Sequence, residues 1–355
     1  AVDHNQLTME IMKKVAAKHN MVCLLHEKPF EGINGSGKHN TFALSTDTGI
    51  NLLEPGDTPH ENAQFLVFLA AIIKAVDEHQ DLLRLSVATA GNDHRLGANE
   101  APPAIISIFL GDELTAVLKA IEEDKPYDGK EKELMKIGAT VLPKFPKDST
   151  DRNRTSPFAF TGNRFELRAV GSSDNCAEAM IVLNTIVADE LTAFRERVDA
   201  RIEAGVRKEK AIYEELKSMI RSSQAIRFDG NGYSEEWRAE AARRGLDCET
   251  CAPRVFDRYL DRASIEMFAR MGVLSKVELE ARTEVKWETY IKKIQIEGRV
   301  LGDLTMNHIV PIASRYEALL LDKVYKILQI GQGLDASADI DLIKRIQQHT
   351  ALIQQ

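Results

Sequence analysis

The sequence contains little cysteine and no long apolar run. Four cysteines among 355 residues are too few for a disulfide framework. No apolar stretch approaches the roughly 18 residues that a membrane span requires. The first residues, Ala-Val-Asp-His-Asn-Gln, have neither the basic nor the apolar part of a signal peptide. We therefore expect a cytoplasmic protein that does not work at a membrane.

The chain also lacks an excess of positive charge. Lys and Arg total 46 against 54 Asp and Glu, which gives a net charge of −8. Because nucleic-acid binding needs a basic surface, these numbers exclude nucleic acid as the main partner. A hydrophobic share of 44% and a length of 355 residues are ordinary for a globular protein of two domains.

The segment Cys248-Glu-Thr-Cys251 is the single CxxC pair of the chain. A structural zinc site of this type needs a second pair, which the sequence does not contain. We interpret the two cysteines as loop thiols without a metal or redox role.

Hydrophobic periodicity predicts an α+β part over residues 1–224 and an all-helical part over residues 225–355. In the first part the pattern predicts these helices: 5–19 closed by Asn20, one that starts at Thr58, one that starts near Asp112, and one from Ser172 or Ser173 to about 222 with a break at Gly205. It predicts strands at 21–25 and 41–46 and a strand–turn–strand unit within 158–170. In the second part it predicts helices at 254–271, 276–329 with an interruption at Pro311, and 337–353.

The stretch Lys28–Leu44 is the centre of the sequence pattern. In Asn34-Gly35-Ser36-Gly37 glycines alternate with polar residues, and His39 follows two places later. Such glycines permit positive φ and the close approach of a ligand, and free N–H groups in a turn favour an anion. The strands predicted at 21–25 and 41–46 make this stretch a wide hairpin connection. The alternative to a ligand-binding loop is a tight turn between strands. For His39 alone, a structural, hydrogen-bonded imidazole is the alternative.

A second cluster alternates polar and apolar residues along a predicted strand. Phe165 and Leu167 would face the core, while Arg164, Glu166 and Arg168 would share the opposite face. Glu166 would suit a hard divalent cation, and the arginines would suit carboxylate or phosphate. For this cluster alone, a solvated salt-bridge ladder is favoured by about two to one.

Two further segments carry candidate residues. Arg95-Leu-Gly-Ala-Asn-Glu100-Ala-Pro-Pro103 reads as a turn with one arginine and one glutamate, and Asp151-Arg-Asn-Arg154 is strongly cationic. Taken singly, Glu100 would be a surface carboxylate and Arg152 and Arg154 part of a flexible charged loop.

In this order, the four segments resemble the glutamine synthetase family, and most closely its large type III branch. Lys28-Pro29 followed by Asn34-Gly35-Ser36-Gly37-Lys38-His39 is similar to the ATP- and glutamate-binding signature. Arg95…Glu100-Ala-Pro is similar to the flap motif, Arg152-Asn-Arg154 to the Arg-Asn-Arg motif, and Arg164-Phe-Glu166-Leu-Arg168 to the Arg-x-Glu-x-Arg strand. The resemblance covers residues 1 to about 200.

The resemblance implies a glutamine synthetase/guanido kinase-like catalytic domain, in which an antiparallel sheet carries helices. It implies ligation of ammonia to L-glutamate through γ-glutamyl phosphate, with ATP and Mg²⁺ or Mn²⁺, by a cytoplasmic homododecamer of two stacked hexameric rings. The implied residues are His39 and Glu166 for the metal; Asn34, Gly35, His39, Arg95 and Arg168 for glutamate; Glu100 and Arg154 for catalysis; and Lys28, Arg154 and Arg164 for the nucleotide. Phosphoryl transfer to a carboxylate needs cations and exclusion of water, which this set would supply.

The chain departs from the family pattern at several places. Ala43 stands where the family usually has serine, the flap is one residue shorter than in the commoner bacterial form, and no tyrosine matches the adenylylation site of that form. The family's other metal carboxylates and its small N-terminal β-domain lie before the matched region, so we expect this chain to be part of a longer polypeptide. The alternatives are a γ-glutamyl-amine ligase, a truncated non-catalytic oligomerising subunit and, more distantly, a phosphagen kinase.

Overall fold

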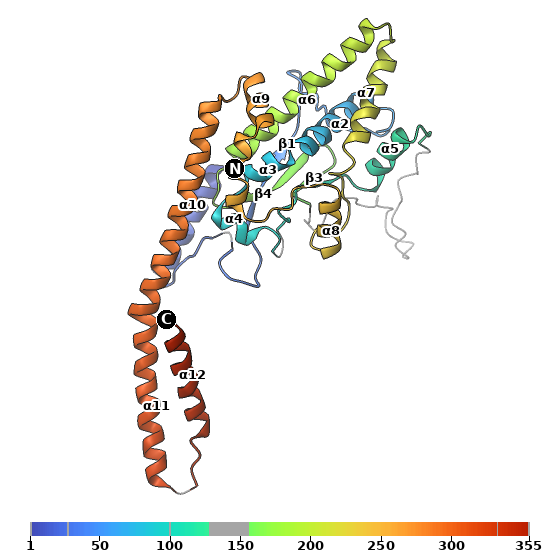
Figure 1. Ribbon diagram of the computed structural model, residues 1–355. Coiled ribbons are helices and arrows are strands. Elements are labelled where there is room, and N and C mark those ends of the chain that lie inside the picture. Colours follow the sequence, from blue (N-terminus) through green and yellow to red (C-terminus); the bar gives the residue numbers. More distant parts are fainter. Residues whose placement is uncertain (1, 27, 99–100, 128–155, 332, 354–355) are drawn as a thin grey trace, which may run out of the picture. The chain divides into compact units, whose positions relative to one another are not determined.

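The computed structural model describes residues 2–26, 28–98, 101–127, 156–331 and 333–353 (Figure 1). The chain forms two compact units, Ala1–Trp287 and Glu288–Gln355. No helix among the described residues has the length and apolar character needed to cross a bilayer. The boundary between these units, at 287/288, differs from the domain boundary expected at 224/225. The expected boundary rests on the change to all-helical structure and stays a prediction.

The elements follow one another along the chain, and the first unit contains every strand of the described residues. Its elements are α1 (Val2–Lys18), β1 (Gly37–Phe42), α2 (Ala63–Glu78), α3 (Gln80–Ser86), α4 (Ala90–Arg95), β2 (Ile108–Phe109), α5 (Asp112–Glu122), β3 (Phe158–Phe160), β4 (Phe165–Gly171), α6 (Ala177–Glu203), α7 (Lys208–Ser222), α8 (Glu235–Arg243), α9 (Arg262–Arg270) and the start of α10 (Lys276–Leu304). The second unit holds the rest of α10, a π-helical turn (Thr305–Ile309), α11 (Val310–Ile330) and α12 (Ser337–Ile353).

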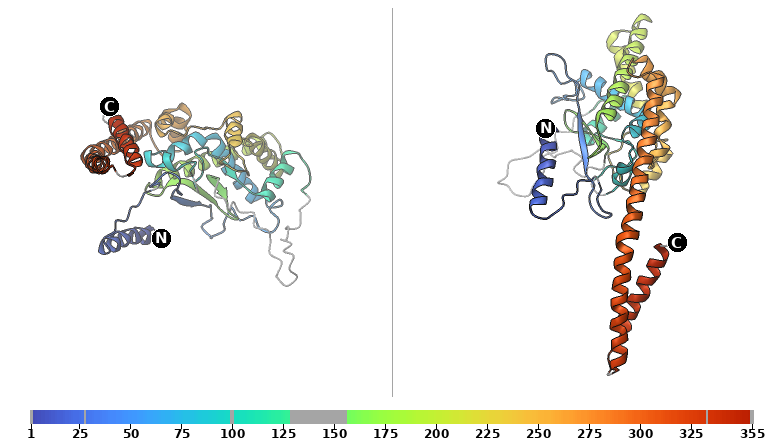
Figure 2. Two further views of the ribbon diagram at one scale, coloured as in Figure 1. Left: turned by 90° about the horizontal axis from the view of Figure 1, so that it is seen from below. Right: turned by 90° about the vertical axis from the view of Figure 1, so that its left-hand side faces the viewer.

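The strands form one sheet in the order β1-β4-β3-β2. β4 is antiparallel to both β1 and β3, and only the short β2 runs parallel to its neighbour. Helix α2 covers one face, where Phe65 lies 5.9 Å from Phe160 between ring centroids (Figure 2, left). The expected α+β fold with an antiparallel-dominated sheet is confirmed.

Helix α2 begins later than its sequence suggests. Thr58–Glu61 form a turn in which the Glu61 N–H donates to the Thr58 carbonyl at 3.0 Å, and Asn62 caps the helix by accepting from the Phe65 N–H at 3.0 Å. The predicted start at Thr58 is therefore wrong, because a good capping residue also suits the turn that precedes the helix.

The glycine-rich stretch does not connect a hairpin. Residues 21–25 form no strand, and Val22 and Leu24 are 83% and 69% exposed. The second predicted strand, 41–46, is replaced by β1, which starts at Gly37 and pairs with the distant β4. The hairpin prediction is wrong because an apolar run becomes a strand only where a partner covers its backbone.

Helix α6 starts at Ala177 instead of Ser172 or Ser173. β4 continues to Gly171, the chain turns so that the Asp174 N–H donates to the Gly171 carbonyl at 3.2 Å, and Asn175 accepts from the Ala177 N–H at 2.8 Å. The predicted break at Gly205 is confirmed, since this residue has φ +88° and ends the helix.

The predicted helix at 254–271 is wrong in its first part. Two 3₁₀ turns, Ala252–Arg254 and Phe256–Leu260, precede α9, and they bury Phe256 and Tyr259. Farther on, the predicted interruption near Pro311 takes the form of the π turn. Proline lacks the N–H that an α-helix uses there, and the wider turn before it accommodates the loss.

A histidine at the junction of α2 and α3 is expected to make the stability of the chain depend on pH. Burial lowers the pKa of the His79 imidazole below its ordinary value of 6.5, although Glu78, Asp81 and Asp189 oppose the shift. The native state binds this proton more weakly than the unfolded chain. The contribution of His79 to stability is therefore fully present above 6.5 and is lost as the pH falls from 6.5 through the lowered native pKa. We expect the unfolding temperature to drop between pH 7.5 and 5.5 and His79→Gln to flatten that drop. Equal slopes for the two proteins would contradict this assignment.

Candidate functional site

A β-bulge positions the candidate site between β1 and β4. Lys38 lies opposite Val170 and Asn40 lies opposite Leu167, so two residues of β4, Arg168 and Ala169, face the single residue His39. A bulge of this kind bends the strand and redirects side chains, and bulges are common next to active sites.

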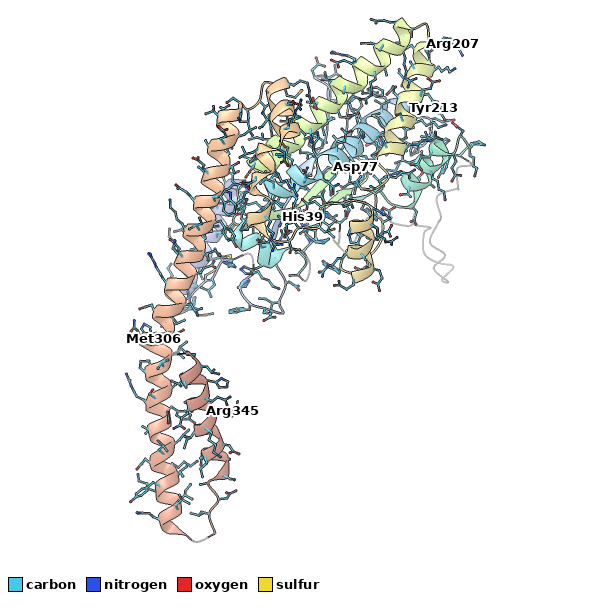
Figure 3. The ribbon with its side chains drawn as sticks, viewed as in Figure 1. His39, Asp77, Arg207, Tyr213, Met306 and Arg345 are labelled. Carbon is cyan, nitrogen blue, oxygen red and sulfur yellow. The ribbon has the colours of Figure 1, made fainter. Side chains whose placement is uncertain are left out.

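The bulge brings three of the predicted residues together. The His39 Nδ1 lies 3.8 Å from the Glu166 Oε2, and the Arg168 Nε donates to the same oxygen at 3.2 Å. The side chains of His39, Glu166 and Arg168 are 36%, 24% and 5% exposed, and Figure 3 labels His39. Phe165 and Leu167 are fully buried, as predicted from the alternation. The site therefore combines a reachable imidazole and carboxylate with a sheltered guanidinium group.

The donor chemistry of this cluster fits a divalent metal in part. Imidazole nitrogen and carboxylate oxygen are both ligands of Mn²⁺, and carboxylate oxygen is the ligand that Mg²⁺ prefers. Within the described ranges no group of three or more His, Cys, Asp or Glu residues could hold a metal ion. His39 and Glu166 would thus supply two ligands of a larger set.

Arg95 lies beneath this cluster instead of in the expected turn. It is the last residue of α4 and is 1% exposed. Its Nη2 donates to the Arg168 carbonyl at 2.9 Å, and its Nη1 donates to the Ala169 and Val170 carbonyls, both at 3.3 Å. The guanidinium group therefore bonds the backbone carbonyls of the bulge, where the regular strand ladder is interrupted.

The position of Arg95 explains why residue 37 is a glycine. A Cβ atom at Gly37 would stand 1.9 Å from the Arg95 Nη2 and 2.4 Å from its Cζ. The second glycine of Asn34-Gly35-Ser36-Gly37 thus allows the close approach of an arginine of the same chain, where the sequence suggested a ligand.

Buried polar residues that the sequence analysis did not single out complete the support of the site. The Asn92 Nδ2 donates to the Val87 and Ala169 carbonyls at 2.7 and 2.8 Å, and its Oδ1 accepts from Arg95 at 3.1 Å. Thr89 caps α4 and donates to the Asp174 Oδ2 at 2.9 Å. In the sequence, the capping residue Thr89 at the start of Thr89-Ala-Gly-Asn92 is the feature that could have predicted the short helix α4.

The remaining predicted residues lie elsewhere or outside the described residues. Lys28 and the exposed Asn34 belong to the loop before β1, and Arg164 is exposed in the turn before β4. Among the described residues no hydrogen bond or ion pair links these three to the cluster of His39, Glu166 and Arg168. Gly35 is half-buried in the same loop. Glu100, Arg152 and Arg154 lie outside the described residues.

The CxxC segment is held by hydrogen bonds from a buried arginine. The buried Arg84 donates to the Glu249 and Thr250 carbonyls at 3.0 and 3.1 Å, and Cys248 and Cys251 are free thiols. Burial raises the pKa of the Cys248 thiol, which disfavours the reactive thiolate. These contacts support the interpretation of loop thiols.

Comparison with known proteins shows the family of this chain. Residues 1–108 match the family model of the glutamine synthetase catalytic domain, and residues 211–328 match that of the glutamine synthetase C-terminal domain. The chain belongs to the glutamine synthetase family.

Individual proteins of known sequence or structure also resemble this chain. A glutamine synthetase of Bacteroides fragilis is 49% identical over 360 residues, which cover 99% of this chain and 49% of the relative. A type-3 glutamine synthetase of Dictyostelium discoideum is 48% identical over 333 residues, which cover 94% of this chain and 45% of the relative. The chain thus spans about half the length of the curated relatives it matches. A solved structure titled "Apo GmaS without ligand" aligns over 82% of this chain and 50% of its own, with TM-score 0.44 and 15% identity.

Proposed function

We propose that the protein to which this chain belongs ligates ammonia to L-glutamate at the expense of ATP, with γ-glutamyl phosphate as the intermediate. The observation that carries the proposal is the cluster of His39, Glu166 and Arg168 on the bulged β1–β4 pair, in a chain of the glutamine synthetase family. A carboxylate between an imidazole and a guanidinium group suits a site that handles phosphate and carboxylate anions.

The chemistry consists of two displacements. An oxygen of the glutamate γ-carboxylate attacks the γ-phosphorus of ATP, and ADP leaves. The nitrogen of ammonia then attacks the acyl carbon, phosphate leaves, and one proton of that nitrogen passes to a base. Both steps gather negative charge in one place and require that water be excluded.

Each residue of the cluster has a part in these steps. His39 and Glu166 would hold Mg²⁺ or Mn²⁺, which when bound neutralises charge on the transferring phosphoryl group. Arg168 orients the Glu166 carboxylate through its Nε–H and offers positive charge to a substrate carboxylate. The other metal ligands would be water or residues beyond the described set.

Arg95 enters the proposal chiefly as a positioning residue. Its guanidinium group bonds the carbonyls of Arg168, Ala169 and Val170 and so fixes the backbone on which Glu166 and Arg168 stand. The direct contact with glutamate that the family resemblance implies stays a prediction.

The other assignments come from the resemblance alone. They are Asn34 and Gly35 for the glutamate amino side; Lys28, Arg154 and Arg164 for the nucleotide; Glu100 for closing the site and deprotonating ammonium; a cytoplasmic location; and a double hexameric ring. The proposed domains remain 1–224 for the catalytic part and 225–355 for the helical part.

Glu100→Ala in the natural protein tests the flap assignment. Because this carboxylate would act on ammonium after glutamate has bound, we expect glutamine formation to fall by about 100-fold while glutamate affinity changes little. Calorimetric titration of glutamate, beside a coupled phosphate assay, separates the two effects. Normal turnover by the variant would show that Glu100 does not serve the reaction.

A further inference from the structure

Helix α4 is too short to hold its own position. It comprises only Ala90–Arg95, and fewer than two turns of isolated helix are not stable in water. Asn92 and Arg95 donate to β4 carbonyls, and Figure 1 shows α4 beside β4. The position of Arg95, and with it the geometry of the β1–β4 bulge, therefore depends on what holds the rest of this helix.

A second side of α4 is held through Asp93. The Asp93 Oδ2 accepts from the Ala252 N–H at 2.7 Å, and its Oδ1 accepts from the Arg84 Nη2 at 3.3 Å. The Arg84 side chain is fully buried, and that of Asp93 is 18% exposed. Because water and salt screen such a pair far less than a surface pair, the loss of either partner strongly disturbs the contact.

The segment that binds Asp93 is a loop with a defined conformation, residues 247–252. Inside the loop, the Glu249 N–H donates to the Asp247 Oδ1 at 2.8 Å, and the Cys251 N–H donates to the Glu249 Oε1 at 2.9 Å. The Asp247 N–H donates to the Gln80 Oε1 at 3.0 Å, which joins the loop to α3. The loop thus offers Asp93 a fixed support.

These contacts join the two parts of the chain that the family models match. Helix α4 lies within residues 1–108, and the loop lies within residues 211–328. The contacts lead from the loop through Asp93 to α4, and from Arg95 at the end of α4 to the carbonyls of the bulge. A helix is rigid over so short a length, so a displacement at Asp93 would move Arg95 as well.

We propose that Asp93 is a positioning residue of the candidate site, which fixes α4 to the loop 247–252. The fixed helix keeps Arg95 beneath the bulge, and the bulge keeps His39 and Glu166 within reach of one metal ion. The proposal rests on the metal assignment of the proposed function. It makes a loop from the C-terminal family domain part of the support of the catalytic cluster.

The variant Asp93→Ala of the natural protein tests this role, and Glu190→Ala is its matched control. Glu190 is also a carboxylate inside the first unit that pairs with an arginine, since its Oε1 lies 2.6 Å from the Arg197 Nη2 and its side chain is 5% exposed. In each variant the arginine keeps other acceptors, because Arg84 bonds two loop carbonyls and Arg197 bonds the Glu215 carboxylate. The two changes therefore differ mainly in their connection to α4.

The affinity for Mn²⁺ is the first measurement. We expect the dissociation constant, from electron paramagnetic resonance of the free ion, to rise about fivefold or more for Asp93→Ala and to stay unchanged for Glu190→Ala. Equal constants for these two variants would overturn the proposal. If the unchanged protein bound no Mn²⁺, the metal assignment itself would be contradicted, and the positioning role would be decided by the next measurement.

Hydrogen exchange in β4 tests the positioning role without the metal. The Arg168 N–H donates to the Pro157 carbonyl at 2.8 Å beside the bulge, so its exchange reports on the local opening of the strand. Relative to α5 in the same sample, the β4 amides of Asp93→Ala should exchange at least about fivefold faster than those of the unchanged protein. The same ratio should not rise in Glu190→Ala. The internal reference removes the effect of a general loss of stability, so an unchanged ratio in Asp93→Ala would overturn the proposal.

Discussion

The variant Glu166→Gln of the natural protein is expected to bind Mn²⁺ at least about 100-fold more weakly than the unchanged protein. The Glu166 carboxylate stands 3.8 Å from the His39 Nδ1 and accepts from the Arg168 Nε at 3.2 Å. Glutamine keeps the size of the side chain and an oxygen for Arg168, but it removes the negative charge that a hard cation requires. Electron paramagnetic resonance of free Mn²⁺ measures the affinity directly.

A matched control separates metal binding from general charge loss. Glu54 is an exposed carboxylate of the same unit, and its Oε2 accepts from the Asn163 Nδ2 at 3.3 Å. Glu54→Gln should leave Mn²⁺ affinity unchanged, and both variants should unfold at the temperature of the unchanged protein. If Glu166→Gln bound Mn²⁺ normally, this carboxylate would not be a ligand, and Arg168 would be its structural partner only.

Gly37→Ala is expected to destabilise the chain by roughly 3 kcal/mol or more, because the new Cβ would overlap a buried guanidinium group. The predicted clash is 1.9 Å from the Arg95 Nη2, and Arg95 cannot retreat while it bonds three carbonyls of β4. The free energy of unfolding in urea provides the measurement.

A double-mutant cycle isolates this contact. Arg95→Ala alone should also cost roughly 3 kcal/mol, since it leaves buried carbonyls without donors. In that background Gly37→Ala should cost at least about 1 kcal/mol less than it does alone, because the clashing group is gone. Additive effects would mean that Gly37 is required for its backbone conformation and not for the space that Arg95 occupies.

Local patterns in the sequence predicted the parts of the fold that depend on neighbouring residues. The alternation around Phe165 and Leu167 predicted β4, and the helical spacing of apolar residues after Asp112 predicted α5. The glycine at 205 predicted the end of α6, where a left-handed residue is required. These elements are determined by periodicity and by single residues with unusual backbone freedom.

The parts that the sequence did not predict depend on contacts between distant segments. The pairing of β1 with β4, the bulge opposite His39 and the position of Arg95 beneath Gly37 join segments far apart in the chain. No periodicity records such contacts, so the glycine stretch was interpreted as a hairpin turn. The adjacency of His39 and Glu166 followed from the family resemblance, whereas the burial of Arg168 needed the structure.

The helical part shows the same division. Proline at 311 predicted an interruption of the long helix, but not that the interruption would take the form of a π turn over Thr305–Ile309.

Glutamine formation by the natural protein tests the central claim most directly. With ATP, L-glutamate and ammonium, the account predicts one glutamine for each ADP released, much faster turnover than with methylamine in place of ammonium, and loss of both products in Glu166→Gln. Preference for methylamine would indicate a γ-glutamyl-amine ligase. Release of neither product by the unchanged protein, or equal turnover by Glu166→Gln, would contradict a ligase site built on His39, Glu166 and Arg168.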